Sequence, residues 1–124
     1  MNDSIYQINL PTKEISISAN KTLLYFVGDR CRFSREEMQQ LDSLAATFKK
    51  EKIDIIVLDK AGMGLSKDIC SQNEWQYHFA PNLFDTDFSY QLWVNATPTG
   101  IFIVNNVIRN MTFRIKKNLE ELFQ

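Results

Sequence analysis

The sequence has few of the residues that build stapled or metal-bound domains. It contains two cysteines, Cys31 and Cys70, and one histidine, His78, in 124 residues. The cysteines do not form a C-x-x-C pair, and these three dispersed side chains fall short of a tetrahedral zinc site. We therefore expect no metal, no other cofactor, and a fold held by its core rather than by disulfides.

Glycine and proline are also scarce, with four and three residues. No repeat, low-complexity tract or linker interrupts the chain. This pattern predicts a single domain spanning residues 1–124, a length typical of one domain. Apolar residues make up 44% of the sequence, enough for a buried core.

Neither sign of charge dominates, since fourteen basic and fifteen acidic residues leave a net charge of −1. Proteins that bind nucleic acid usually show a basic excess, so no such partner is predicted. The longest apolar run, residues 99–104, is far shorter than the roughly 20 residues of a membrane-spanning helix. Residues 1–20 show no secretory signal, so an exported protein would carry its signal outside this sequence.

Two continuous apolar runs, residues 22–27 and 53–58, predict strands that are buried on both faces. Between them, apolar residues recur at helical spacing from Phe33 to about Lys50, which predicts one long helix. This order forms a right-handed βαβ unit with parallel strands. Alternating residues at 14–18 predict a half-buried edge strand.

A helical, aromatic-rich insert is predicted over residues 60–97. Within it, residues 66–79 show weak helical periodicity, and residues 87–93 predict a short helix. Most of the aromatic side chains are expected in the core, and the remainder are candidates for a partner surface.

The C-terminal part predicts a β-hairpin and a helix. Strands at 99–104 and 107–113 are joined by an Asn105-Asn106 turn, and a helix follows. The whole order predicts an α/β fold with a central mixed sheet flanked by helices on both faces.

Cys31 lies between the first buried strand and the long helix. Open α/β sheets place their sites at the carboxyl ends of strands. The free N–H groups and the dipole of a helix N-terminus stabilise a thiolate and lower its pKa. Arg30 and Arg32 flank the cysteine and act in the same direction. The alternative is a buried structural cysteine.

Residues 26–38 resemble the active-site segment of thioredoxin-like proteins, above all the TlpA/ResA branch of exported thiol-disulfide oxidoreductases. In that branch a C-x-x-C motif is followed by Arg-Glu-Glu-Met, as at residues 35–38 here. Thr97-Pro98-Thr99 resembles the family's Thr-Pro-Thr segment with its cis-proline. The resemblance covers residues 12–123 and implies a thioredoxin fold and a bacterial cell envelope location, with the cytoplasm as the alternative.

The resemblance makes Cys31 the nucleophile and puts Ser34 where the family has its resolving cysteine. A serine hydroxyl cannot resolve a mixed disulfide, so release would need an outside thiol, the partner's second thiol, or Cys70. Ser34 also fits an N-cap in a capping box with Glu37. A serine introduced to trap mixed disulfides would look the same in the sequence.

The same resemblance assigns a substrate-binding surface. The backbone of Thr97 is expected to pair with an extended substrate segment beside Pro98, and the residues around the cysteine complete the surface: Arg30, Arg32 and Phe33. The alternative for Pro98 is a proline at the first position of a strand, where its missing N–H is harmless.

Two functions follow from these residues. The first is thiol-disulfide exchange, in which Cys31 forms mixed disulfides with protein or small-molecule thiols. The second is a redox-silent binding module that uses the groove beside Pro98. We expect the exchange function, a monomer, and a structural role for Cys70. Two departures from the family leave open how protons are transferred near Cys31. Arg30 replaces the family's tryptophan, and Tyr25 replaces its buried polar residue.

Overall fold

The computed structural model of the chain describes residues 7–10, 13–17, 20–28, 32–62, 64–81 and 99–112, and their side chains except at 7–16, 32–34 and 110. The elements in chain order are β1 (Gln7–Leu10), β2 (Lys13–Ser16), β3 (Lys21–Val27), α1 (Arg32–Ser43), α2 (Ala45–Lys50), β4 (Asp54–Asp59), α3 (Gly64–Asn73), β5 (Gln76–Phe79), β6 (Thr99–Val104) and β7 (Val107–Thr112).

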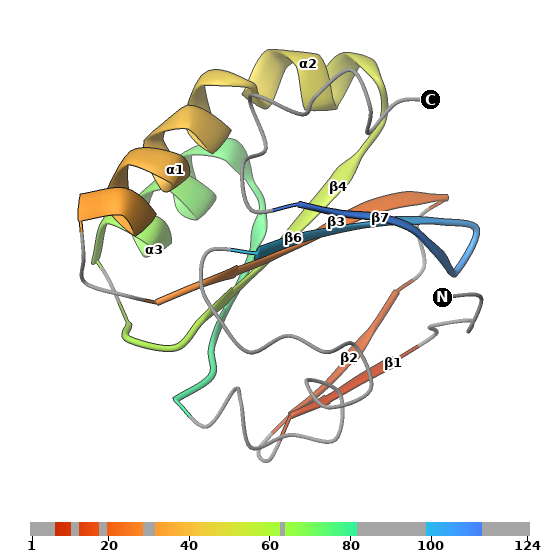
Figure 1. Cartoon of the computed structure of the whole chain (residues 1–124), viewed down its shortest axis with the longest axis horizontal. Coiled ribbons are helices and arrows are strands. Elements are labelled where there is room, and N and C mark those ends of the chain that lie inside the picture. Colours follow the sequence, from red (N-terminus) through yellow and green to blue (C-terminus); the bar gives the residue numbers. More distant parts are fainter. Residues whose placement is uncertain are drawn as a thin grey trace.

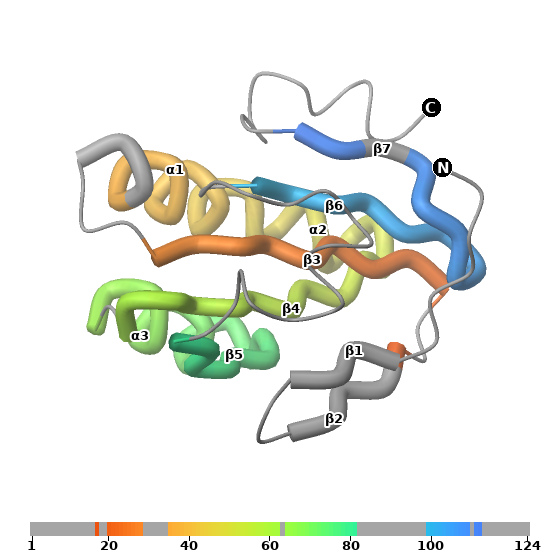
Figure 2. The backbone as a smooth tube through the Cα atoms, turned by 60° about the horizontal axis from the view of Figure 1, so that its bottom comes forward, coloured from red at the N-terminus to blue at the C-terminus, as the bar shows by residue number. Residues whose placement is uncertain are grey.

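A five-stranded mixed sheet in the order β5-β4-β3-β6-β7 forms the centre of the molecule (Figure 2). The strands β3, β4 and β5 are parallel, whereas β6 and β7 continue the sheet in antiparallel pairing. This confirms the predicted βαβ unit, hairpin and mixed sheet. The strand predicted at 14–18 exists as β2, but it pairs with β1 in a separate two-stranded sheet.

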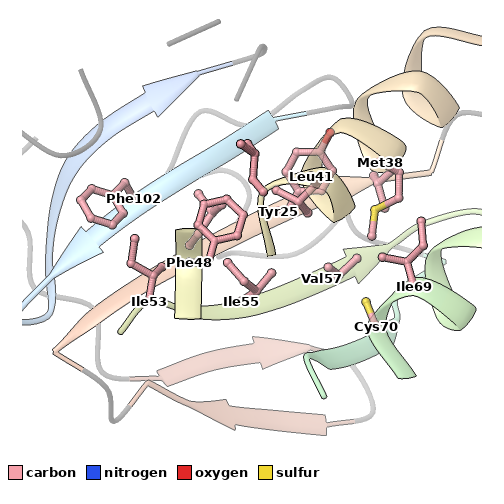
Figure 3. Close-up of a cluster of buried hydrophobic side chains, with 13 residues drawn as sticks. Tyr25, Met38, Leu41, Phe48, Ile53, Ile55, Val57, Ile69, Cys70 and Phe102 are labelled. Carbon is pink, nitrogen blue, oxygen red and sulfur yellow. The ribbon is translucent and has the colours of Figure 1, made fainter. Parts of the chain in front are cut away.

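The two faces of the sheet bury different side chains of β3. Leu24 and Phe26 lie in the cluster on one face, and Leu23 and Tyr25 lie in the cluster on the other. This explains why the apolar run of β3 is continuous rather than alternating. The helices α1, α2 and α3 all lie on the second face (Figure 1). Figure 3 shows that face with Met38, Leu41 and Phe48 of the helices packed over it.

The single helix predicted between the first two buried strands is divided into α1 and α2. At the junction, the Leu44 N–H donates to the Leu41 carbonyl at 3.1 Å, which is the tighter i−3 pattern. Leu44 and Phe48 are both buried. Both side chains pack against the sheet at this tightened turn. The helical periodicity of the sequence does not show where such a turn occurs.

The weak helix predicted over residues 66–79 is wrong in its second half. The helix α3 ends at Asn73, and residues 76–79 form β5 instead. Hydrogen bonding to the buried strand β4 overrides the local pattern there. The helices expected at 87–93 and after 113 lie outside the described residues. All helices that the structure does describe lie on one face of the sheet.

The helices α2 and α3 end in the same way, with a non-glycine residue in the left-handed conformation. Lys52 has φ 58° and Glu74 has φ 59°. In each case the N–H of the next residue donates to the carbonyl five positions earlier at 2.9 Å, which is the Schellman pattern.

Glycine adopts this conformation without a Cβ penalty. We therefore expect Lys52→Gly and Glu74→Gly each to raise the free energy of unfolding by about 0.5–1 kcal/mol. Urea denaturation of the two variants and of the unchanged protein measures the difference. A loss of stability in both variants would contradict the assignment of these caps.

Candidate functional site

The helix expected after Cys31 begins directly at Arg32, and β3 ends at Val27. Cys31 and Arg30 themselves lie outside the described residues. For Arg32, Phe33 and Ser34 the structure describes only the backbone, which forms the first turn of α1. The N-cap predicted at Ser34 is therefore wrong, because the helix begins two residues earlier and Ser34 lies inside it. The strand and the helix that were predicted to flank Cys31 in the chain are therefore confirmed.

The second predicted motif, Thr97-Pro98-Thr99, leads into β6, which is the strand next to β3. Thr97 and Pro98 lie outside the described residues, but Thr99 is the first residue of β6 and pairs with Phe26 near the end of β3. Adjacent strands are about 4.8 Å apart. Because β6 is antiparallel to β3, it begins where β3 ends. The end of β3, which precedes Cys31 in the chain, and the start of β6, which follows Pro98, therefore lie side by side at one edge of the sheet.

Gly28 starts the turn that leads to Cys31, and only glycine fits there. Its φ is +148°, and a Cβ built on it would lie 2.5 Å from the Cβ and 2.6 Å from the backbone nitrogen of Lys60. The Lys60 N–H donates to the Val27 carbonyl at 2.8 Å. The turn after β3 and the turn after β4 are therefore in direct contact next to the candidate site.

Asp59 organises the same edge from the end of β4. Its side chain is fully buried, and Oδ1 accepts the N–H groups of Ala61 at 3.1 Å and Gly62 at 3.0 Å. Oδ2 accepts the hydroxyl of Tyr77 at 2.7 Å, which ties β5 to this turn. Sequence reasoning missed Asp59, although an aspartate that precedes a glycine-containing turn is a known turn signal.

Cys70 lies in the core beneath this turn. It belongs to α3, its side chain is 1% exposed, and it packs with Ile69 in the helix-facing cluster (Figure 3). Burial, followed by the negative charge of Asp59, raises the pKa of the Cys70 thiol to about 12. Such a thiol stays protonated at neutral pH and is a poor nucleophile. Its position is that of a structural cysteine, as expected.

Tyr25 and Glu37 form a buried polar pair beneath the first half of α1. Both side chains are almost completely inaccessible. Burial raises the pKa of Tyr25 far above its usual value, and the negative charge of Glu37 adds to the shift. Tyr25 therefore remains a neutral hydroxyl at any physiological pH. Among the described residues this hydroxyl has no hydrogen-bond partner.

The buried Tyr25 and the half-buried Tyr77 are expected to respond in opposite ways to the loss of their hydroxyl groups. Tyr25→Phe removes a buried hydroxyl that lacks a partner, so the free energy of unfolding should stay unchanged or rise by about 1 kcal/mol. Tyr77→Phe removes the donor to a buried carboxylate oxygen, so the free energy of unfolding should fall by about 1–3 kcal/mol. Urea denaturation of both variants tests this. A larger loss for Tyr25→Phe would contradict the hydrogen-bond assignment.

In the part of the chain that the structure describes, no group of three or more His, Cys, Asp or Glu side chains is arranged to hold a metal ion. No helix in these same segments is long and apolar enough to cross a membrane.

No protein-family model and no curated protein sequence matches the chain. Solved structures do resemble it. The thioredoxin domain of a thiol-disulfide oxidoreductase from Bacteroides vulgatus matches with TM-score 0.67 and 16% identity, over 98% of this chain and 94% of that one. A thiol-disulfide oxidoreductase from Bacteroides fragilis matches with TM-score 0.68 and 18% identity, over 97% and 99%.

StoA from Bacillus subtilis is similar with TM-score 0.61 and 13% identity, over 100% of this chain and 97% of that one. At these identities the likeness concerns the fold. Together with the strand order, it confirms the predicted fold class: the chain has the thioredoxin fold.

Proposed function

We propose that this chain carries out thiol-disulfide exchange through Cys31. The observation that supports the proposal is the pairing of Phe26 with Thr99, which puts the end of β3 and the start of β6 side by side in a thioredoxin-fold sheet. Solved structures with this fold include two that are described as thiol-disulfide oxidoreductases, which supports the same chemistry here.

The first chemical step is attack of the Cys31 thiolate on one sulfur of a substrate disulfide. A sulfur–sulfur bond forms between Cys31 and the substrate, the substrate disulfide breaks, and its other sulfur leaves as a thiolate that takes up a proton. We expect the N-terminus of α1 to stabilise the Cys31 thiolate before attack, because the helix begins at the next residue, Arg32, and its first N–H groups have no partner within the helix. The charges of Arg30 and Arg32 add to this stabilisation.

The second step requires a thiol from outside the chain. Ser34 has no sulfur, and Cys70 is buried with a pKa raised to about 12. An external thiolate, or the substrate's own second thiol, attacks the mixed disulfide and releases Cys31 as a thiolate. The resulting chemistry is that of a monothiol exchange protein or isomerase acting on protein or small-molecule thiols. Thr97 and Pro98 would bind the substrate backbone.

The resemblance to exported oxidoreductases supports a location in the cell envelope, where disulfides persist. In that compartment an external thiol or a substrate with two cysteines is needed for turnover. We propose that the chain acts as a monomer, which sedimentation of the reduced protein would test.

The experiment that tests the function is alkylation of the folded protein as a function of pH. We expect Cys31 to react with iodoacetamide with a pKa well below about 8.5, the value of a free thiol. Cys70 should stay unlabelled until the protein is unfolded, and it serves as the internal control. A Cys31 pKa of about 9 or above, or no labelling of folded Cys31, would remove the proposal.

A further inference from the structure

A pocket lies at the opposite end of the molecule from the Cys31 turn. It has a volume of about 670 Å³, within the range of ligand sites of about 300–1,000 Å³. Its walls are α2, the carboxyl end of α3, and the amino ends of β4 and β5. Since β4 runs parallel to β3, this edge is remote from the edge where β3 ends. The proposed exchange chemistry does not use it.

An aromatic pair forms one wall of this pocket. The rings of Phe48 and Trp75 meet edge to face, with centroids 6.3 Å apart and an interplanar angle of 65°. Phe48 is buried, whereas Trp75 is half-buried and lines the pocket. The accessible part of the Trp75 indole is therefore available to a group bound in the pocket, and an indole ring attracts a cation through its quadrupole.

A side-chain hydrogen-bond acceptor, the amide oxygen of Asn73, lies at the end of α3. The Asn73 amide nitrogen donates to Asp42 Oδ1 at 2.8 Å and to the Ile69 carbonyl at 3.0 Å, so both of its hydrogens are used. The Asn73 amide oxygen remains as an acceptor on a residue that lines the pocket. The carbonyl end of a helix also carries partial negative charge.

Charged side chains line the rim on two sides. The exposed carboxylate of Glu74 directly follows the end of α3, and that of Asp54 lies at the start of β4. The exposed Lys49 and Lys52 lie at the end of α2 and just after it. A cationic group would therefore be drawn to the α3 side and repelled from the α2 side.

We propose that this pocket binds an alkyl guanidinium or alkyl ammonium group, with its charge at the end of α3 and its apolar stem against Trp75. A free small molecule and an arginine or lysine side chain of a partner protein share this chemistry. The pocket is thus a second binding site, independent of Cys31.

The test uses the fluorescence of Trp75 in the full chain. Trp75 and Trp93 are the two tryptophans, so Trp93→Phe leaves Trp75 as the reporter. We expect n-butylguanidinium to change its emission saturably at low ionic strength, and neutral n-butanol to leave it unchanged. If Trp93→Phe does not fold, the NMR signal of the Trp75 indole N–H in the unchanged protein gives the same readout.

Two variants of the rim give opposite expected shifts. Glu74→Gln should weaken butylguanidinium binding by about threefold, and Lys52→Gln should strengthen it by a similar factor. A short blocked peptide with one arginine distinguishes the sources: tighter binding than butylguanidinium indicates a partner side chain, and weaker binding indicates a free small molecule.

Absence of a saturable change, an equal change with n-butanol, or rim variants that shift the affinity in the same direction would overturn the proposal. The titration involves no thiol chemistry. Its result is therefore separate from the result of the alkylation experiment on Cys31.

Discussion

Replacement of Cys31 by serine should abolish covalent capture of disulfide substrates. A mixed disulfide needs a sulfur atom at the attacking position, and an oxygen at the same place cannot form one. With oxidised glutathione as substrate, the unchanged protein should gain the mass of one glutathione at Cys31, and Cys31→Ser should gain none. Intact-protein mass spectrometry followed by peptide mapping measures both results.

Cys70→Ala is the matched control for the loss of a cysteine. Because Cys70 is buried in the cluster between α3 and the sheet, this variant should keep full glutathione capture while losing some stability. Capture that depends on Cys70 would contradict the assignment of the nucleophile. If the unchanged protein forms no mixed disulfide, yet it and Cys31→Ser bind the same partner equally, the chain is a redox-silent binding module instead.

Replacement of Gly28 by alanine should destabilise the protein by about 3 kcal/mol or more. Two effects act together. The φ of +148° is unfavourable for any residue with a Cβ, and that Cβ would lie 2.5 Å from the Cβ of Lys60 and 2.9 Å from the backbone nitrogen of Ala61. Relief requires the β3–α1 and β4–α3 turns to separate, so the Lys60–Val27 hydrogen bond should be lost as well.

Gly64→Ala is the control for a glycine without these constraints. No atom lies within 4 Å of a Cβ built there, and Gly64 is the exposed first residue of α3. Alanine is the better helix former, so stability should stay the same or rise by up to about 1 kcal/mol. Urea denaturation of the two variants gives the comparison. Equal effects of Gly28→Ala and Gly64→Ala would show that the contact with Lys60 does not constrain Gly28.

Gly28→Ala also tests the link between the fold and the candidate site. The residues from Gly28 to Arg32 connect the end of β3 to the start of α1, so a shift of this turn moves the position of Cys31. A folded Gly28→Ala variant should therefore show a Cys31 pKa closer to that of a free thiol, because the thiolate is less well placed at the helix N-terminus.

Local pattern was sufficient for the strands β3, β4 and β6 and for most of the first helical region. Continuous apolar runs mark buried strands because both faces of the sheet are covered, and this property is visible residue by residue. The Asn105-Asn106 turn was also predictable, because asparagine tolerates the left-handed conformation that both residues adopt, with φ 52° and 67°.

Other features depend on partners that are distant in the chain. Residues 76–79 form a strand because the backbone of β4 is available beside them, and nothing in their own order shows this. The same holds for the bond between Tyr77 and Asp59 and for the burial of Tyr25 next to Glu37. Each joins residues from two elements, so none follows from periodicity.

By itself, the sequence determined the βαβ frame, the hairpin and the two motifs around Cys31 and Pro98, since these depend on neighbouring residues. Contacts between distant residues place the end of β3 beside the start of β6, bury Cys70, and form a pocket at the opposite edge of the sheet. The physical reason is that strand register and helix docking are set by contacts between residues separated by tens of positions, as Phe26 and Thr99 show.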